Sequence, residues 1–310
     1  MSKKALGYLA VSAAAVLWAL GGTYASDLID RGASFVELTE ARAWITALVL
    51  LIVVSVRGSR PQDRAAAAKA PFWVTLLFGC SIAAANLTYY ASLSRLPVAI
   101  AITVQYTAPG LVVAWTALAG RDRASRRVVG ALVAAIVGVA LLAELPVLIG
   151  EGHLRVDGIG LLVAGVSAFA FATYILSGQH VGRAFGPRGS VLRGFLVSSA
   201  IWIVVQAARG RPDTLLDTEF LPGILFLAVA TTIAPFMLFV WGLEHVSPSD
   251  AGIVSTLEPL AAALFAFLWL GQSLSGWQLA GAALVIAGIG IVQTERPERK
   301  DVLAERAAIE

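Results

Sequence analysis

Long apolar runs separated by short polar breaks dominate the 310-residue chain. Each run has roughly 20 residues, enough for a helix to cross about 30 Å of hydrocarbon at about 1.5 Å per residue. The runs are continuously apolar, whereas the strands of a membrane barrel would alternate with a period of two. We therefore expect ten membrane-spanning helices, at residues 5–26, 35–56, 71–92, 97–119, 127–146, 158–179, 189–208, 219–241, 248–270 and 275–293.

Composition and charge agree with a membrane protein. Hydrophobic residues make up 58% of the chain and charged residues 14%, whereas soluble domains have about 25% charged residues. The net charge of +3 comes from residues in short loops and not from a basic stripe, so no nucleic-acid partner is expected. Seventeen of the 23 Lys and Arg residues fall on the side of the N-terminus and six on the other side, which predicts that both termini are cytoplasmic.

The chain matches itself at a fixed shift, which indicates an internal repeat. A shift of 150 residues aligns 93–142 with 243–292, and a shift of 153 aligns the first predicted helix with the sixth. The matched pairs include Leu93 with Leu243, Pro109 with Pro259, Gly138 with Gly288, Gly7 with Gly160 and Ala15 with Ala168. Because each half has five spans, the second half must enter the membrane from the opposite side.

The predicted fold is therefore an all-α membrane protein with ten transmembrane helices, arranged as two inverted five-helix repeats around a central cavity. The first repeat covers residues 1–150, the second covers 151–294, and 295–310 form a cytoplasmic tail. Inverted repeats are the architecture of many alternating-access carriers, whose substrate site lies at the repeat interface near the midplane. We expect a monomer, because ten helices can pack around one cavity.

The segment Leu243–Ser275 carries a resemblance to a known family. It reads LEHVSPSDAGIVSTLEPLAAALFAFLWLGQSLS, with Leu-Glu-Pro followed by a Leu-Gly turn. This pattern resembles the EamA-type transporters of the drug/metabolite transporter superfamily, although the usual acid after Leu-Gly is replaced here by Gln272. The resemblance implies a ten-helix bundle in the bacterial inner membrane that exports amino acids, other metabolites or drugs.

One carboxylate is placed deep in a predicted span. Glu258 lies in the middle of the ninth helix beside Pro259, where an ionisable side chain costs about 3 kcal/mol or more. Proline removes a backbone hydrogen bond and kinks a helix, so Pro259 and its repeat mate Pro109 predict two kinks. Glu258 either faces the cavity, where it binds a proton or a substrate amine, or it bonds to a neighbouring helix and fixes packing.

Polar and aromatic side chains at core depth predict the lining of the cavity. The candidates are Trp18, Tyr24, Asn86, Tyr90, Gln105, Tyr106, Tyr174, Ser255 and Glu258. Such side chains combine an apolar body with a hydrogen-bonding group and can hold a small amphipathic solute. The alternatives are interhelical hydrogen bonds, worth about 0.6–1 kcal/mol each, and a belt at the membrane interface.

Two arginines occupy equivalent positions in the two halves. Arg42 lies near the start of the second helix and Arg193 near the start of the seventh, with Glu40 close to Arg42. These three residues are a possible gate. Alternatively, the arginines extend their charged groups to the lipid headgroups.

Several chemistries have no motif in the chain. There is no Gly-x-x-x-x-Gly-Lys-Ser/Thr loop for nucleotides and no His-Glu-x-x-His or Cys/His cluster for metals. We therefore expect no cofactor, no metal and no enzymatic activity. The leading hypothesis is a secondary exporter of small amphipathic metabolites, amino acids first, with possible proton coupling through Glu258. An uncoupled facilitator and an intramembrane enzyme acting on lipid are the alternatives.

Overall fold

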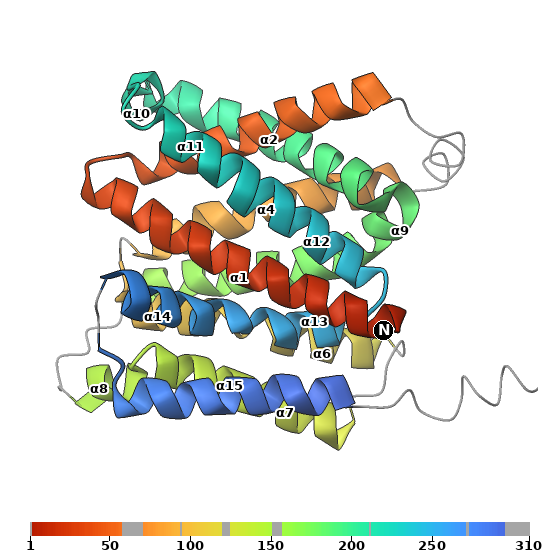
Figure 1. Cartoon of the computed structure of the whole chain (residues 1–310), viewed down its shortest axis with the longest axis vertical. Helices are drawn as coiled ribbons and strands as arrows, with labels where there is room; N and C mark the ends of the chain where they lie inside the picture. Colours follow the sequence, from red (N-terminus) through yellow and green to blue (C-terminus); the bar gives the residue numbers. More distant parts are fainter. Residues whose placement is uncertain are drawn as a thin grey trace, which may run out of the picture.

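The computed structural model describes residues 2–57, 71–93, 95–119, 125–150, 157–210, 212–270 and 273–294. These residues are almost entirely helical (Figure 1). The helices are α1 (Lys3–Asp30), α2 (Phe35–Arg57), α4 (Phe72–Leu93), α5 (Val98–Gln105), α6 (Ala108–Leu118), α7 (Arg126–Leu142), α8 (Leu145–Gly150), α9 (Gly158–Arg209), α10 (Asp213–Leu216), α11 (Leu221–Ala228), the π-helical turn η1 (Val229–Ile233), α12 (Ala234–Leu243), α13 (Pro248–Ser255), α14 (Leu257–Leu270) and α15 (Gly276–Thr294).

Within the described ranges, eight helical segments are long and apolar enough to cross a membrane. One of them, α9, has 52 residues and covers two predicted spans, 158–179 and 189–208. It bends at Gly186, whose φ of +63° is a conformation that glycine adopts readily. The next residue is Pro187, which lacks the backbone N–H of a regular helix. The chain therefore turns between these spans at a sharp kink, where we had expected a loop. The total of ten spans stays a prediction.

The predicted fourth and ninth helices are each interrupted at an equivalent point. The fourth consists of α5 and α6, separated by Tyr106 and Thr107. The ninth consists of α13 and α14, separated by Thr256. Pro109 and Pro259 lie in the first turns of α6 and α14, where a missing backbone N–H leaves no hydrogen bond unmade.

The helices α7 and α15 pack side by side (Figure 1), and glycines lie at their closest contacts. A Cβ on Gly138 would lie 2.8 Å from the Gly281 carbonyl oxygen, and a Cβ on Gly288 would lie 2.8 Å from the Ala131 carbonyl oxygen. The 150-residue shift converts the first contact into the second. The residue numbers run in opposite directions along the two helices, so these repeat mates are antiparallel, as an inverted repeat requires.

A second pair of contacts is related by the internal repeat in the same way. A Cβ on Gly7 would lie 3.0 Å from Val246, and a Cβ on Gly160 would lie 2.8 Å from Leu96. Gly160 is the repeat mate of Gly7, and Val246 is the repeat mate of Leu96. The first helix of each half therefore packs against the other half through the same kind of contact, which supports a twofold relation between the halves.

The beginning of α1 and the end of α15 lie at the same end of the bundle (Figure 1). The Tyr8 hydroxyl donates to the Val292 carbonyl at 3.3 Å and to the Asp250 carboxylate at 2.6 Å. We call the opposite end, which bears the turn between α1 and α2, the α1–α2 end.

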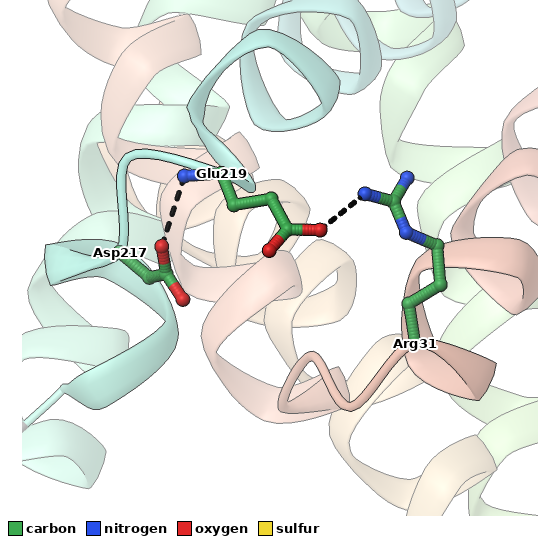
Figure 2. A network of polar contacts seen from close by, with 3 residues as sticks. All are labelled: Arg31, Asp217 and Glu219. Atoms are coloured by element: carbon green, nitrogen blue, oxygen red, sulfur yellow. Dashed lines mark hydrogen bonds and ion pairs between the residues drawn. The ribbon is translucent and has the colours of Figure 1, made fainter.

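Two exposed ion pairs join elements at the α1–α2 end. Arg31 at the end of α1 donates to Glu219 at 2.6 Å, and the Glu219 backbone N–H donates to Asp217 (Figure 2). Arg95 donates to Asp157, the N-cap of α9, at 2.9 Å. The hydrogen bond from Arg95 and the backbone N–H of Ile159 lower the pKa of Asp157 below its ordinary value. Both ion pairs are exposed to water, so each contributes little to the free energy of unfolding.

Candidate functional site

A cavity of about 150 Å³ lies between the helices, in the half of the bundle toward the α1–α2 end. Its lining comes from α1, α2, α4, α5, α9, α12 and α14 together with Tyr106 at the break after α5. The lining residues are Trp18, Gly22, Arg42, Ile82, Ala85, Asn86, Tyr89, Tyr90, Gln105, Tyr106, Phe171, Tyr174, Phe236 and Glu258. An engineered cavity of about this volume accepts benzene, so the space suits a molecule with a handful of heavy atoms.

The two halves of the chain contribute different chemistry to this cavity. The first half supplies the arginine, both amides and four aromatic rings, whereas the second half supplies one carboxyl group, that of Glu258, and the rings of Phe171, Tyr174 and Phe236. The cavity therefore combines charged and amide groups with aromatic rings, a lining that suits an amphipathic solute.

Opposite charges face this one cavity. The Arg42 Nε donates to the Thr232 hydroxyl at 2.8 Å, so the two terminal amino groups of the guanidinium take no part in this bond. Glu258 lines the same cavity, and the Tyr106 hydroxyl hydrogen-bonds to its carboxyl. In the described part of the chain, the two ion pairs with an N–O distance within 4.0 Å are those of Arg31 with Glu219 and of Arg95 with Asp157. Arg42 and Glu258 therefore form no ion pair with each other.

The partner of Arg42 is positioned by an irregular turn. The π-helical turn η1 precedes Pro235, whose ring excludes the normal hydrogen bond to the carbonyl four residues earlier. Thr231 and Thr232 both donate to the Leu227 carbonyl, which stabilises the widened turn. The sequence analysis missed Thr232, although two threonines before a proline in an apolar span were a usable signal.

Hydrogen bonds hold the amide side chains of the lining in place. Asn86 Nδ2 donates to the Ile82 carbonyl at 2.8 Å. Gln105 Nε2 donates to the Ser167 hydroxyl at 3.1 Å, and Ser167 in turn donates to the Ala85 carbonyl at 3.2 Å. These bonds use amide donors and leave the amide oxygens of Asn86 and Gln105 as acceptors for an occupant.

Aromatic rings form the other wall around Tyr174. Its ring stacks on Phe78 with centroids 5.3 Å apart and on Phe239 at 5.5 Å, and Trp18 contacts it edge-on at 6.4 Å. The Tyr174 hydroxyl and the Trp18 indole N–H are buried and find no hydrogen-bond partner among the described residues. Phe236 completes this wall at 5.5 Å from Tyr174, and the sequence analysis did not include it among the candidates.

Seven of the nine cavity candidates line the cavity: Trp18, Asn86, Tyr90, Gln105, Tyr106, Tyr174 and Glu258. The structure places the other two elsewhere. Tyr24 packs against Phe226 at 5.0 Å and Trp269 at 6.2 Å. The Ser255 hydroxyl is fully buried and donates to the Gly252 carbonyl at 2.6 Å.

The three candidate gate residues lie in different surroundings. Arg42 lines the cavity, while Arg193 donates to the Gly189 carbonyl and lies over the Phe185 ring at 4.0 Å. Glu40 is fully buried and neither of its oxygens has a hydrogen-bond partner within the described ranges. Gln272 and the predicted tail at 295–310 lie outside the described residues.

A bundle of apolar helices around a small cavity lined by an arginine, a glutamate and aromatic rings is typical of a membrane protein with a binding site between its helices. The comparisons with known proteins identify its family. The EamA-like transporter family matches twice, at residues 5–143 and 158–294, so the chain belongs to this family and to the drug/metabolite transporter superfamily. The protein is thus a multi-pass membrane transporter, and the two matches correspond to the two halves.

Named relatives and a solved structure agree with this assignment. The threonine/homoserine exporter RhtA of Salmonella typhimurium is 30% identical over 226 residues, which cover 72% of each chain. The RhtA of Escherichia coli K12 is 29% identical over 228 residues, covering 73% of this chain and 72% of the relative. A protein of known crystal structure is similar in fold, with a TM-score of 0.75, 18% identity and coverage of 94% and 96% of the two chains.

Proposed function

We propose that this protein exports small zwitterionic amino acids across the bacterial inner membrane by alternating access. The observation that carries the proposal is that the side chains of Arg42 and Glu258 line one cavity of about 150 Å³ and form no ion pair with each other. An α-amino acid carries a carboxylate and an ammonium group. It would bring the carboxylate to Arg42 and the ammonium to Glu258, so that each of these half-buried side chains gains an ionic partner.

The aromatic wall supports a small side chain on the substrate. With the two charged groups of the amino acid held at the polar side, the remaining space faces Phe171, Tyr174 and Phe236. A cavity of a volume that accepts benzene has room for the two charged groups of the substrate and a few more heavy atoms. The names of the RhtA relatives, which specify threonine and homoserine, point to side chains of this size.

The exchanged contacts between the halves support a mechanism of alternating access. In an inverted repeat, the two halves can swap conformations and so open the same cavity to either side in turn. The interrupted helices at Tyr106 and Thr256 supply places where the backbone can bend. The proposal includes ten spans, both termini in the cytoplasm and a monomeric carrier.

Counterflow in proteoliposomes tests the proposed function. Vesicles loaded with unlabelled threonine should take up labelled threonine faster than empty vesicles, and only when the protein is present. The amino alcohol that lacks the carboxylate and the hydroxy acid that lacks the ammonium group should both compete poorly, since each leaves either Arg42 or Glu258 without an ionic partner. Equal competition by all three compounds would exclude zwitterion recognition.

A further inference from the structure

The side chain of Glu40 is the most isolated charge-bearing group in the described part of the chain. Its exposed fraction is 0%, and both carboxyl oxygens lack a hydrogen-bond partner there. Glu37, one turn earlier on α2, is also buried, but its carboxylate accepts the backbone N–H groups of Thr214 and Leu215 at 2.8 and 3.3 Å. An unpaired buried carboxylate is very costly, whereas a neutral carboxyl costs far less, so Glu40 holds a proton in this conformation.

Further buried polar atoms without partners belong to the same pair of packed helices as this carboxyl, and we call this set of atoms the polar seam. Of the nine buried side-chain atoms without a partner in the described chain, six belong to α2 or to the second segment of α9. They are both Glu40 oxygens, the hydroxyls of Thr46, Ser198 and Ser199, and Gln206 Oε1. The two helices pack with Trp44 Nε1 donating to the Ser199 carbonyl at 3.3 Å, which places Glu40 between this contact and the end of α9.

The seam has an exposed arginine at one end and a small cavity at the other. At the end of α9, Arg209 is exposed and close enough to act electrostatically on Glu40. At the other end, Ser198 lines a cavity of about 20 Å³, enough for one water molecule. Arg42 and Asn86 line both this small cavity and the main cavity. Polar atoms left without partners beside a water-sized space indicate a path that water can occupy.

Few other titratable groups act on Glu40. The helices packed against α2 are α9, α10, α11, η1 and α1. From these, Arg209 of α9 and Glu37 of α2 itself are the charged groups that act on the carboxyl. Asp213 of α10 and the acids at the end of α1 are exposed, and α11 and η1 contain no titratable residue. Among the described residues, Glu40 is therefore influenced by one cation and forms no ion pair within 4.0 Å, which suits a group that carries a proton.

We propose that Glu40 is the proton-carrying carboxyl of this transporter, reached from the α1–α2 end through the polar seam between α2 and α9. This proposal rests on the proposed function, and it assigns proton transfer to Glu40 and substrate binding to Glu258. One proton binds a Glu40 oxygen from the α1–α2 end, which the charge pattern predicts to be the outer face. The proton leaves toward the cytoplasm when α2 moves, and no other bond forms or breaks. Because Arg42 lies on the same helix, that movement also displaces the substrate's carboxylate contact.

Two transport assays on the Glu40→Gln variant test this proposal. Counterflow needs only substrate exchange, whereas a pH gradient drives net transport only when a proton moves in each cycle. For one proton per cycle, a gradient of one pH unit supports about a tenfold substrate ratio. We expect the wild type to approach that ratio, and we expect Glu40→Gln to stay near a ratio of one while its counterflow persists. Glu37→Gln, the matched change one turn away, should retain the gradient-driven ratio.

Other outcomes separate the two proposals. If the wild type shows no threonine counterflow, the proposed function fails. If counterflow is present and Glu40→Gln keeps the gradient-driven ratio, the assignment of Glu40 fails while the function stands. If Glu40→Gln does not fold, Glu40→Asp replaces it, and this variant should keep gradient-driven transport with an altered pH profile. An infrared spectrum gives an independent check, because the wild type should show a protonated-carboxyl band that Glu40→Gln removes, and its persistence would overturn the assignment.

Discussion

Replacing Arg42 with glutamine removes the cation that we assign to the substrate carboxylate. A hydrogen bond to a charged group contributes about 1.5–3 kcal/mol, and each 1.4 kcal/mol changes an affinity about tenfold. Arg42→Gln should therefore raise the half-saturating concentration of threonine by about 10- to 150-fold. The bond from Arg42 Nε to Thr232 is also lost, so part of the effect could come from altered packing of η1.

A second ligand separates the lost contact from altered packing. The amino alcohol derived from threonine has a hydroxymethyl group in place of the carboxylate and otherwise keeps the same atoms. Competition by threonine and by the amino alcohol is measured in counterflow for the wild type and for Arg42→Gln, which forms a double-mutant cycle. The wild type should discriminate strongly between the two compounds, and the variant should discriminate little.

The matched control is Arg193→Gln, because Arg193 is the repeat mate of Arg42 but donates to the Gly189 carbonyl and does not line the cavity. This control should leave the discrimination unchanged. If Arg42→Gln weakened binding of both compounds by the same factor, the arginine would act through packing, and the reasoning about its charge would be refuted.

Three further changes have defined outcomes. Glu258→Gln should weaken counterflow of threonine but not competition by the hydroxy acid that lacks an ammonium group, and equal losses would argue against a contact with the ammonium. Gly281→Leu places a Cβ 2.6 Å from a carbonyl oxygen of α7, so it should lower the free energy of unfolding by about 1–3 kcal/mol or more, while Gly290→Leu, which has open space, should change the thermal midpoint little. Asp157 has a pKa below its ordinary value of 3.8, so the stability from its bond with Arg95 is present above that pH and lost as the pH falls below it. The midpoint of Asp157→Asn should therefore fall less steeply in acid than that of the wild type, and parallel curves would show that the pair contributes nothing.

The sequence predicted the helices and much of the lining because both depend on local patterns. Apolar runs of membrane length identify spans directly, and a proline such as Pro109 or Pro259 identifies where a span is interrupted. Polar residues in apolar spans are rare, so Asn86 and Gln105 were natural candidates, and both line the cavity. Glu258 was a candidate because it is an ionisable side chain deep in a predicted span, and it lines the same cavity.

Other features depend on the orientation of each helix about its own axis, which cannot be derived from a single sequence. Tyr24 and Ser255 satisfied the same composition rule as the lining residues but point to other surroundings. Glu40 and Arg42 are two positions apart on α2, so they must point in different directions, and only packing decides which of them meets the cavity. The kink at Gly186, where a loop was expected, likewise depends on a backbone angle that glycine permits but does not require.

Protection of a single cysteine in the cavity tests the central claim most directly. In a background where Cys80, the only cysteine, is replaced by serine, Asn86→Cys places a thiol in the lining between Arg42 and the aromatic wall. A small thiol reagent should label this site, and threonine should slow the labelling with the same half-maximal concentration as in counterflow. Labelling that threonine leaves unchanged, in a variant that still shows threonine counterflow, would contradict the assignment of this cavity as the substrate site.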